Sequence, residues 1–166
     1  EPLFRSRSKI IVVVIIVFTI GSSDDDKSDE QDTCIKGEKE KCLTCNKDKC
    51  GSCNVGYKLV EGKCKEDFSF MSIYETDSEE ENVKLFEEEY LQNVIKIYID
   101  NEKVNPCWKY NFTSPGNHTV YVLLNTSEIK ELHLFNETDK LISANFSKDF
   151  NTENITSMSS LFSRCY

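Results

Sequence analysis

The segment from Cys42 to Cys53 reads CLTCNKDKCGSC and spaces four cysteines as C-x2-C-x4-C-x2-C. Cys34 precedes it and Cys64 follows it, so six of the eight cysteines of this 166-residue chain lie between residues 34 and 64. So short a stretch cannot fold around an apolar core without cross-links, and disulfides persist in oxidising compartments. The spacing therefore predicts a disulfide-stapled module at residues 34–64 of an exported protein.

Zinc binding and redox chemistry are the two alternatives for these cysteines. Paired C-x2-C units of a zinc site are usually separated by roughly 12 to 20 residues, whereas only four residues, 46–49, separate them here. An active dithiol needs a helix N-terminus in a βαβ setting, and the turn-forming residues around both pairs argue against one. Disulfides use all six cysteines in any of 15 connectivities: Cys34, Cys42, Cys45, Cys50, Cys53 and Cys64.

The end of this module carries a resemblance to a known family. The pattern Cys50-x-x-Cys53-x-x-Gly56-Tyr57-x-Leu59, continued to Cys64, resembles the furin-like or growth-factor-receptor-type cysteine-rich repeat. The resemblance implies an extracellular spacer or binding rod without catalytic residues.

The N-terminal segment also indicates export. Arg5, Arg7 and Lys9 precede eleven uncharged residues, 10–20, which read IIVVVIIVFTI. A basic flank, a short apolar stretch and small residues after it are typical of a signal peptide. Eleven residues rise about 16 Å as a helix, short of the roughly 30 Å of a bilayer core. We predict that residues 1–23 are a cleaved signal or, alternatively, a short membrane anchor, and that 24–33 are an acidic linker.

Glycosylation signals are more frequent than composition predicts. With 13 Asn and 27 Ser plus Thr in 166 residues, chance gives 13 × 27/166, or about 2, Asn-x-Ser/Thr sequons. The chain has six, all after residue 110: Asn111, Asn117, Asn125, Asn136, Asn145 and Asn154. The cluster predicts a glycoprotein of a eukaryotic secretory pathway. Asn154 is the weakest of the six sequons, because the interior of a repeat could bury it.

The charge of the chain argues against nucleic acid as a partner. The formal net charge is −9, with acidic runs at 24–26, 79–81 and 87–89. Such runs repel phosphate backbones, and none has the spacing of a calcium loop, so we interpret them as solvated surface.

Residues 65–125 are rich in aromatic and β-branched residues and predict an antiparallel, sandwich-like β module. Strands are expected at 68–74, 94–99, 108–112 and 119–124, with turns at 100–101 and 114–117. Residues 78–92 fit a helix or a strand, and we interpret them as a strand.

The region 126–166 contains an internal repeat. Ile129-x2-Leu132-x2-Phe135 is echoed by Ile155-x2-Met158-x3-Phe162 at an offset of 26 to 27 residues, and a period of 20 to 30 residues suggests a solenoid. Between the copies, 141–146 alternates like a strand, with Ile142, Ala144 and Phe146 on one face. We expect a short helix near the end of the second copy.

Residues 150–165, FNTENITSMSSLFSRC, resemble the repeat of BspA-like leucine-rich-repeat surface proteins, although that family more often has Met where Leu161 stands. The resemblance implies that 129–166 begin an α/β leucine-rich-repeat array, truncated after one and a half units. It also implies that Cys165 is a buried repeat residue. A bridge between Cys107 and Cys165 is the alternative, and a lone half-buried thiol is the simplest reading of Cys107.

The resulting expectation is a mixed, β-rich chain with a disulfide module, an antiparallel β module and the first units of a solenoid. We expect a secreted or cell-surface protein, or one anchored through residues 10–20, that recognises an extracellular protein or glycan. No nucleophile, base and orienting group can be named together around His118 or His133, so we predict no enzymatic activity, cofactor or metal. The alternative is a membrane receptor fragment whose cysteine-rich module binds the ligand.

Overall fold

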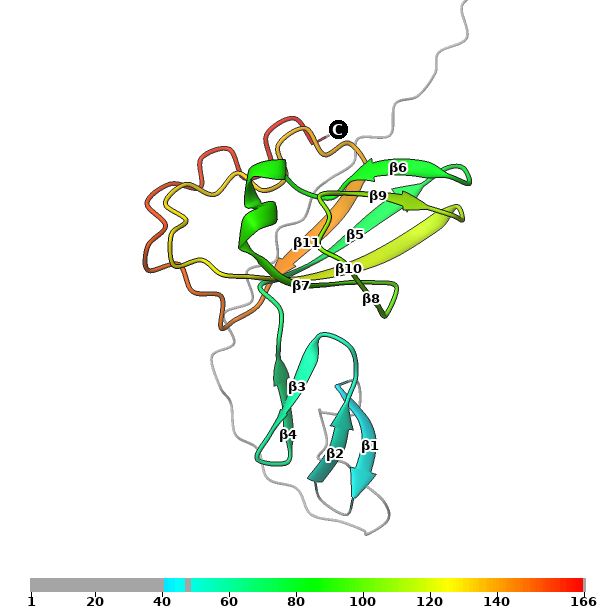
Figure 1. Ribbon diagram of the computed structural model, residues 1–166, viewed down its shortest axis with the longest axis vertical. Coiled ribbons are helices and arrows are strands. Elements are labelled where there is room, and N and C mark those ends of the chain that lie inside the picture. Colours follow the sequence, from blue (N-terminus) through cyan, green and yellow to red (C-terminus); the bar gives the residue numbers. More distant parts are fainter. Residues whose placement is uncertain (1–40, 47–48, 166) are drawn as a thin grey trace, which may run out of the picture.

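The computed structural model of the chain describes residues 41–46 and 49–165 (Figure 1). The regular elements of these residues are β1 Cys42–Asn46, β2 Lys49–Cys53, β3 Tyr57–Val60, β4 Lys63–Glu66, β5 Phe70–Thr76, β6 Glu81–Lys84, the 3-10 helix η1 Glu88–Asn93, β7 Val94–Ile99, β8 Glu102–Val104, β9 Lys109–Phe112, β10 Gly116–Leu124 and β11 Leu141–Phe146. Every pair of these strands is antiparallel, which confirms the predicted β-rich, antiparallel class.

Three predictions fall on residues outside the described ranges. They are the signal peptide or anchor at 1–23, the acidic linker at 24–33 and the bonding of Cys34. In the part of the chain that the structure describes, no helix has the length and apolar character needed to span a bilayer.

The cysteine module consists of two hairpins, β1–β2 and β3–β4, which lie below the main sheet in Figure 1. Glu61 (φ 52°) and Gly62 (φ 79°) connect β3 to β4, and both adopt the left-handed conformation that a two-residue hairpin turn requires. Cys42, Cys50 and Cys64 are buried in a small cluster separate from the main core.

A five-stranded sheet in the order β11-β5-β10-β7-β8 forms the body of the molecule. Alternate residues of β5 and β10 are buried, as expected for a sheet with one face on a core. Phe70, Tyr74, Val120 and Val122 are completely buried on that face. The period-2 pattern of these strands therefore determines which side of the sheet carries the core.

A second, two-stranded sheet, β6–β9, contributes to the same core. Val83 of β6 and Phe112 of β9 are buried in it, together with Leu85 and Phe86 just after β6. The Tyr74 hydroxyl donates a hydrogen bond to the Leu85 carbonyl, which ties the two sheets together. Both sheets thus enclose one apolar interior.

The interpretation of residues 78–92 as a strand is only half right. Strand β6 covers Glu81–Lys84, but the chain then turns into η1, where Tyr90 is buried. The backbone N–H of Glu87 donates to the Leu134 carbonyl (2.9 Å). This bond to a residue 47 positions away in sequence fixes the chain where it leaves the strand. Local pattern could not contain this information.

Strand β11 occupies the predicted residues with a different buried face. Leu141 and Ala144 are buried, while Ile142 and Phe146 are half-buried. A register shift against β5 between Leu141 and Ser143 breaks the alternation. At such an irregularity, successive side chains no longer point to opposite faces of the sheet in strict alternation.

The two repeat copies, defined as the first copy (129–137) and the second copy (155–163), lie side by side and run parallel. The bridge Glu131↔Ser157 is parallel, at the expected offset of 26. Backbone N–H groups of the first copy donate to carbonyls of the second: Leu132 to Ser157 (2.9 Å), Phe135 to Leu161 (3.0 Å) and Glu137 to Ser163 (2.8 Å). The rings of Phe135 and Phe162 stack with centroids 5.3 Å apart.

The predicted short helix near Cys165 is wrong. Residues 159–164 form turns, in which Leu161 N–H donates to Met158 O and Ser163 N–H to Ser160 O, both at 3.2 Å. These bonds close two overlapping four-residue turns, 158–161 and 160–163, and the carbonyl of Leu161 is already bonded to the first copy. The sideways bonds to the neighbouring copy replace a continuous helix.

The β module (65–125) and the repeat region (126–166), which the sequence pattern separates between residues 125 and 126, share one apolar core in the described residues. Strand β11 returns from the repeat region to pair with β5, and Ile129, Leu132 and Phe135 belong to the same buried cluster as the sheet residues. The first copy therefore completes the core of the β module.

Candidate recognition site

The described cysteines of the stapled module form disulfides. Cys42 is bonded to Cys50 and Cys53 to Cys64, each pair with Cα atoms 5.7 Å apart. Cys45 is disulfide-bonded as well. Neither C-x-x-C pair is bonded within itself, because Cys42 and Cys53 each pair with a cysteine at least eight residues away. The Cys53–Cys64 bond joins one hairpin to the other.

Three of these sulfur atoms also satisfy a geometric condition for metal binding. The Sγ atoms of Cys42, Cys50 and Cys64 lie within 4.8 Å of one another. Zinc binds thiolates, and all three sulfurs are consumed in disulfides. The proximity therefore reflects the packing of two adjacent disulfides.

Cys107 and Cys165 are free and half-buried, so the alternative bridge between them is not formed. Burial raises the pKa of both thiols. The Cys165 thiol donates to the Phe135 carbonyl (2.8 Å) and thereby joins the end of the second copy to the first.

The cysteine module is fixed to the sheet at Asp67, which follows β4. The Asp67 carboxylate binds Lys58 of β3 (3.4 Å) and Lys96 of β7, while its backbone N–H donates to the Gly56 carbonyl (2.7 Å). Gly56 has φ 84°, and a Cβ there would lie 2.8 Å from the Tyr121 ring. Glycine is therefore required at this contact, and the module and the sheet form one unit.

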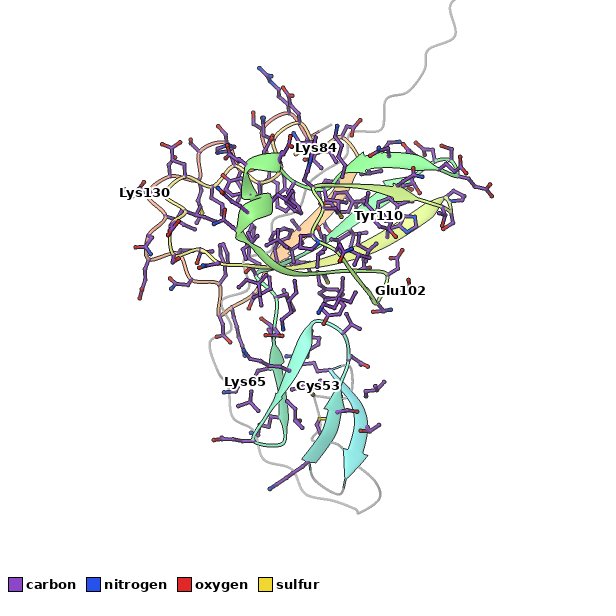
Figure 2. All side chains as sticks on the ribbon, in the orientation of Figure 1. Cys53, Lys65, Lys84, Glu102, Tyr110 and Lys130 are labelled. Carbon is purple, nitrogen blue, oxygen red and sulfur yellow. A yellow bond between two sulfur atoms is a disulfide. The ribbon has the colours of Figure 1, made fainter. Side chains whose placement is uncertain are left out.

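A groove of about 460 Å³ lies between the β3–β4 hairpin and the sheet. Its apolar floor consists of Val60, Phe68, Leu123, Leu124 and Phe150. Its acids are largely satisfied within the protein, since Glu66 accepts hydrogen bonds from the Ser147 hydroxyl (2.8 Å) and the Lys148 N–H (3.1 Å). Lys65 remains exposed at the rim, and Figure 2 shows it on this hairpin. The groove thus combines an apolar floor with polar and charged walls, a lining that suits a ligand with both kinds of group.

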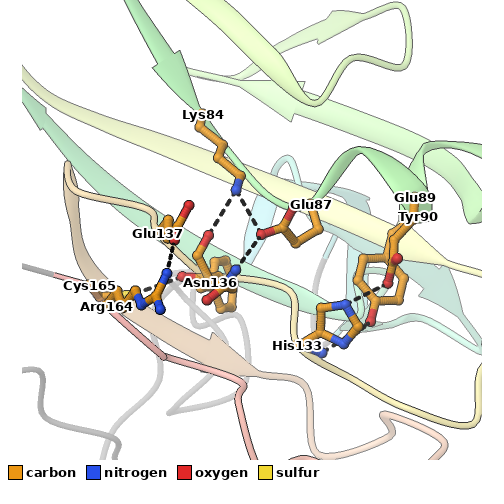
Figure 3. A network of polar contacts seen from close by, with 10 residues as sticks. Lys84, Glu87, Glu89, Tyr90, His133, Asn136, Glu137, Arg164 and Cys165 are labelled. Atoms are coloured by element: carbon orange, nitrogen blue, oxygen red, sulfur yellow. Dashed lines mark hydrogen bonds and ion pairs between the residues drawn. The ribbon is translucent and has the colours of Figure 1, made fainter.

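The first copy is anchored to the sheet by a polar network (Figure 3). Lys84 Nζ donates to Glu87 Oε1 (2.7 Å) and to the Asn136 carbonyl (2.8 Å). Asn136 Nδ2 donates to the same Glu87 oxygen (3.1 Å). The Lys84 and Glu87 side chains are only 19% and 21% exposed, so these charges act in a partly desolvated setting.

Tyr90 forms a second anchor of the first copy. Its hydroxyl donates to the Glu131 carbonyl (2.9 Å) and accepts the His133 N–H (3.0 Å), and burial raises the pKa of Tyr90 to about 12. His133 Nε2 lies 2.7 Å from Glu89. His133 is thus held between two side chains of η1 in a structural role.

His118 is buried and lies in a polar cluster with the buried Thr76 and the exposed Asp100 and Ser114. Its Nδ1 is 2.6 Å from Asp100 Oδ2, and its Nε2 is 2.9 Å from the Ser114 carbonyl and 3.2 Å from Thr76 Oγ1. The Thr76 hydroxyl itself donates to the Ser114 carbonyl (3.0 Å). The order Asp-His-Thr is reminiscent of a catalytic triad, but the hydroxyl bonds to backbone and is buried, so the cluster fastens two turns.

A polar hollow of about 290 Å³ lies across the two copies. It is lined by Glu131, Leu132, His133, Asn136, Ser157, Ser159 and Ser160. Hydroxyl, imidazole and amide groups from neighbouring copies meet here at fixed spacing because backbone hydrogen bonds hold the copies in register. The His133 nitrogens already face Tyr90 and Glu89, and the Asn136 amide donates to Glu87. Hydrogen bonding to a polar ligand would therefore depend on Glu131 and the serines of the second copy.

The sequons differ in accessibility. Asn111, Asn117, Asn125 and Asn154 are exposed among the described residues. Asn136 and Asn145 are half-buried. Asn145 lies on edge strand β11 and pairs with Met71 of β5.

Sequence reasoning missed the groove at Asp67 and the anchors Lys84, Glu87 and Tyr90. The acidic run 87–89 was interpreted as solvated surface, which holds for Glu88 and Glu89 but not for Glu87. The apolar residues Phe86 and Tyr90, which flank the run, were the available signal that this segment packs against the core.

Comparison of the chain with known protein families, curated proteins and solved structures found no match.

Proposed function

We propose that the chain is part of an exported, non-enzymatic surface protein that recognises an extracellular protein or glycan, and that residues 129–165 begin a BspA-like repeat array. The observation that carries this proposal is the parallel stacking of the two copies at an offset of 26 residues. In repeat proteins each unit contacts its neighbours in this way and presents equivalent side chains in a row.

The surface of the stack supports recognition by complementarity. Lys130 and Glu131 of the first copy and Ser159 of the second are exposed, and the polar hollow lies between the copies. Equivalent positions in each copy are held at a constant separation by backbone hydrogen bonds. A row of this kind can contact an extended partner at several points.

The disulfides support export. Two defined disulfides in a module with a cluster of only three buried residues are typical of proteins that fold in an oxidising compartment. The cysteine module, resembling the furin-like repeat, would act as a rigid spacer because Asp67 binds both the module and the sheet.

The test uses the chain secreted from eukaryotic cells and coated on fluorescent beads. The beads are applied to arrays of immobilised oligosaccharides and of purified extracellular-matrix proteins. We expect selective binding that Lys130→Glu on the stack weakens and that Lys103→Glu, the same charge change on the edge strand β8, leaves unchanged. Retention of the chain inside the cells, or equal weakening by both variants, would contradict the proposal.

The second candidate, a receptor fragment whose cysteine module binds the ligand, is favoured by the groove between β3–β4 and the sheet. Lys65→Glu at the rim of that groove distinguishes the two. If binding responds to Lys65→Glu and not to Lys130→Glu, the module carries recognition and the stack does not.

A further inference from the structure

Each sequon has two ends that a glycosyl transferase must reach, the asparagine side chain and the hydroxyl two residues later. Four sequons have an exposed asparagine and a hydroxyl residue that is exposed or half-buried. These open sequons are Asn111–Thr113, Asn117–Thr119, Asn125–Ser127 and Asn154–Thr156. Asn154 Nδ2 donates to the Ser127 carbonyl (3.0 Å) and the Thr156 hydroxyl to the Lys130 carbonyl (3.0 Å), yet both side chains are exposed. Exposure, and not freedom from hydrogen bonds, therefore allows a transferase to approach the open sequons from solvent.

The remaining two, the closed sequons Asn136–Thr138 and Asn145–Ser147, differ at both ends. Their asparagines are half-buried, while Thr138 is 0% and Ser147 is 6% exposed. The Ser147 hydroxyl donates to Glu66 Oε2 (2.8 Å), and Ser147 N–H donates to the Ser69 carbonyl (3.0 Å). The Thr138 hydroxyl is therefore inside the fold, and the Ser147 hydroxyl, in the wall of the groove, is held by Glu66.

Asn136 is also held at its amide. Its Nδ2 donates to Glu87 (3.1 Å) and its backbone carbonyl accepts Lys84 Nζ (2.8 Å). Both residues of this closed sequon would have to leave the core and the polar network of Figure 3 before an enzyme could act. Such local opening is infrequent where packing is dense.

We infer that the closed sequons accept glycans only before residues 126–147 fold, whereas the open sequons accept them on the folded chain. This inference rests on the proposed export of the chain. In the transfer, the asparagine nitrogen forms a bond to C1 of the oligosaccharide and its proton passes to a base of the transferase. The bond from C1 to the pyrophosphate oxygen of a lipid-linked donor breaks, and the lipid pyrophosphate leaves.

The folded structure can hold a glycan added early at Asn136. This residue lines the polar hollow of about 290 Å³, so a sugar on Nδ2 has a path to solvent while one N–H remains for Glu87. Asn145 is half-exposed on an edge strand, the outer side of which faces no other strand among the described residues. The closed sequons therefore differ from the open ones in when a glycan can be added, and not in whether the folded chain has room for one.

The experiment compares rates on folded and unfolded protein. The full chain, produced without glycans in an oxidising bacterial compartment, is incubated with purified oligosaccharyltransferase and a lipid-pyrophosphate-linked oligosaccharide. A parallel sample carries Phe70→Asp and Val122→Asp, which place two charges at completely buried core positions, and is reduced and alkylated so that the whole chain stays unfolded. Mass spectrometry of proteolytic peptides gives the initial rate at each sequon.

We expect the closed sequons of the folded chain to react about tenfold or more slowly than the open ones, because an opening free energy above about 1.4 kcal/mol reduces the accessible fraction by that factor. In the unfolded chain this difference should disappear. Equal rates on the folded chain, no reaction at the open sequons, or slow reaction of the closed sequons in both samples would overturn the inference.

A separate measurement concerns the export on which the inference rests. If eukaryotic cells secrete no chain or attach no sugar to it, the proposed function fails, while the ratio of rates with purified enzyme still decides whether folding closes Asn136 and Asn145.

Discussion

The first and second copies of the repeat share a sequence pattern and differ in burial. Ile129, Leu132 and Phe135 are 6%, 1% and 0% exposed, because the sheet covers them on one side and the second copy on the other. In the second copy Met158 is 41% exposed and Phe162 is half-buried. The same apolar residues therefore receive different stabilisation according to the number of neighbours.

Polar contacts repeat this difference. The first copy is bound by Lys84, Glu87 and Tyr90 from β6 and η1. The second copy is bound to the first through its backbone, the Cys165 thiol and the exposed ion pair Arg164–Glu137. The first copy thus belongs to the core, and the second depends on the first.

The largest expected effect comes from the stacked rings. Phe135→Ala should lower the free energy of unfolding by about 3–5 kcal/mol, the usual loss for a buried Phe, whereas Phe162→Ala should lower it by about 1–2 kcal/mol. Urea denaturation followed by tryptophan fluorescence measures both. Equal losses would show that the second copy is as well supported as the first.

The equivalent aliphatic pair should show the same ordering. Leu132→Ala is expected to cost about 2–5 kcal/mol because Leu132 is 1% exposed, and Met158→Ala less than about 1 kcal/mol. Thermal unfolding of the two variants alongside the unmodified chain provides the comparison. A larger loss for Met158→Ala would place the second copy, contrary to expectation, in a packed interior.

The polar anchor tests why the first copy is held more firmly. Glu87→Gln removes the charge that binds Lys84 and should cost about 1–2 kcal/mol, since both side chains are partly buried. Arg164→Ala breaks an exposed pair and should cost less than about 1 kcal/mol. The rate of amide hydrogen exchange at residues 129–137 should rise in Glu87→Gln only. A similar rise in Arg164→Ala would show that the polar anchor is not what holds the first copy more firmly.

The smallest effect near neutral pH is that of Tyr90. Because its pKa in the folded chain is raised to about 12 from an ordinary value of 10.0, its stabilising contribution is complete below pH 10 and is lost as the pH rises toward 12. We expect Tyr90→Phe to reduce the slope of stability against pH in that range. An unchanged alkaline slope, measured by denaturation at each pH, would show that the hydroxyl does not anchor the first copy.

Much of the fold was readable from local pattern. Strands are expected at 68–74, 94–99 and 141–146, where aromatic and β-branched residues lie between turns, and the structure has them at Phe70–Thr76, Val94–Ile99 and Leu141–Phe146. The 26-residue offset of the copies was visible because Ile129, Leu132 and Phe135 recur as Ile155, Met158 and Phe162. Spacing alone was enough for these features, because each depends on residues close in the chain.

Other features depended on residues distant in sequence. The acidic run 87–89 predicts solvated surface, but Asn136, 49 residues away, brings Glu87 into a network with Lys84. The end of the chain was expected to be helical, yet its carbonyls bond sideways to the first copy. The bonds to Asn136 and those between the two copies join residues 25 to 52 positions apart, and no local propensity encodes such contacts.

The sequence by itself determined the antiparallel β class, the cysteine-stapled module and the period of the repeat, because spacing and alternation are properties of neighbouring residues. The tertiary structure decided which cysteines pair, where β11 shifts register and how the module is fixed at Asp67. It also decided which sequons close on folding. The physical reason is that burial and pairing depend on side chains and backbone groups contributed by residues distant in sequence.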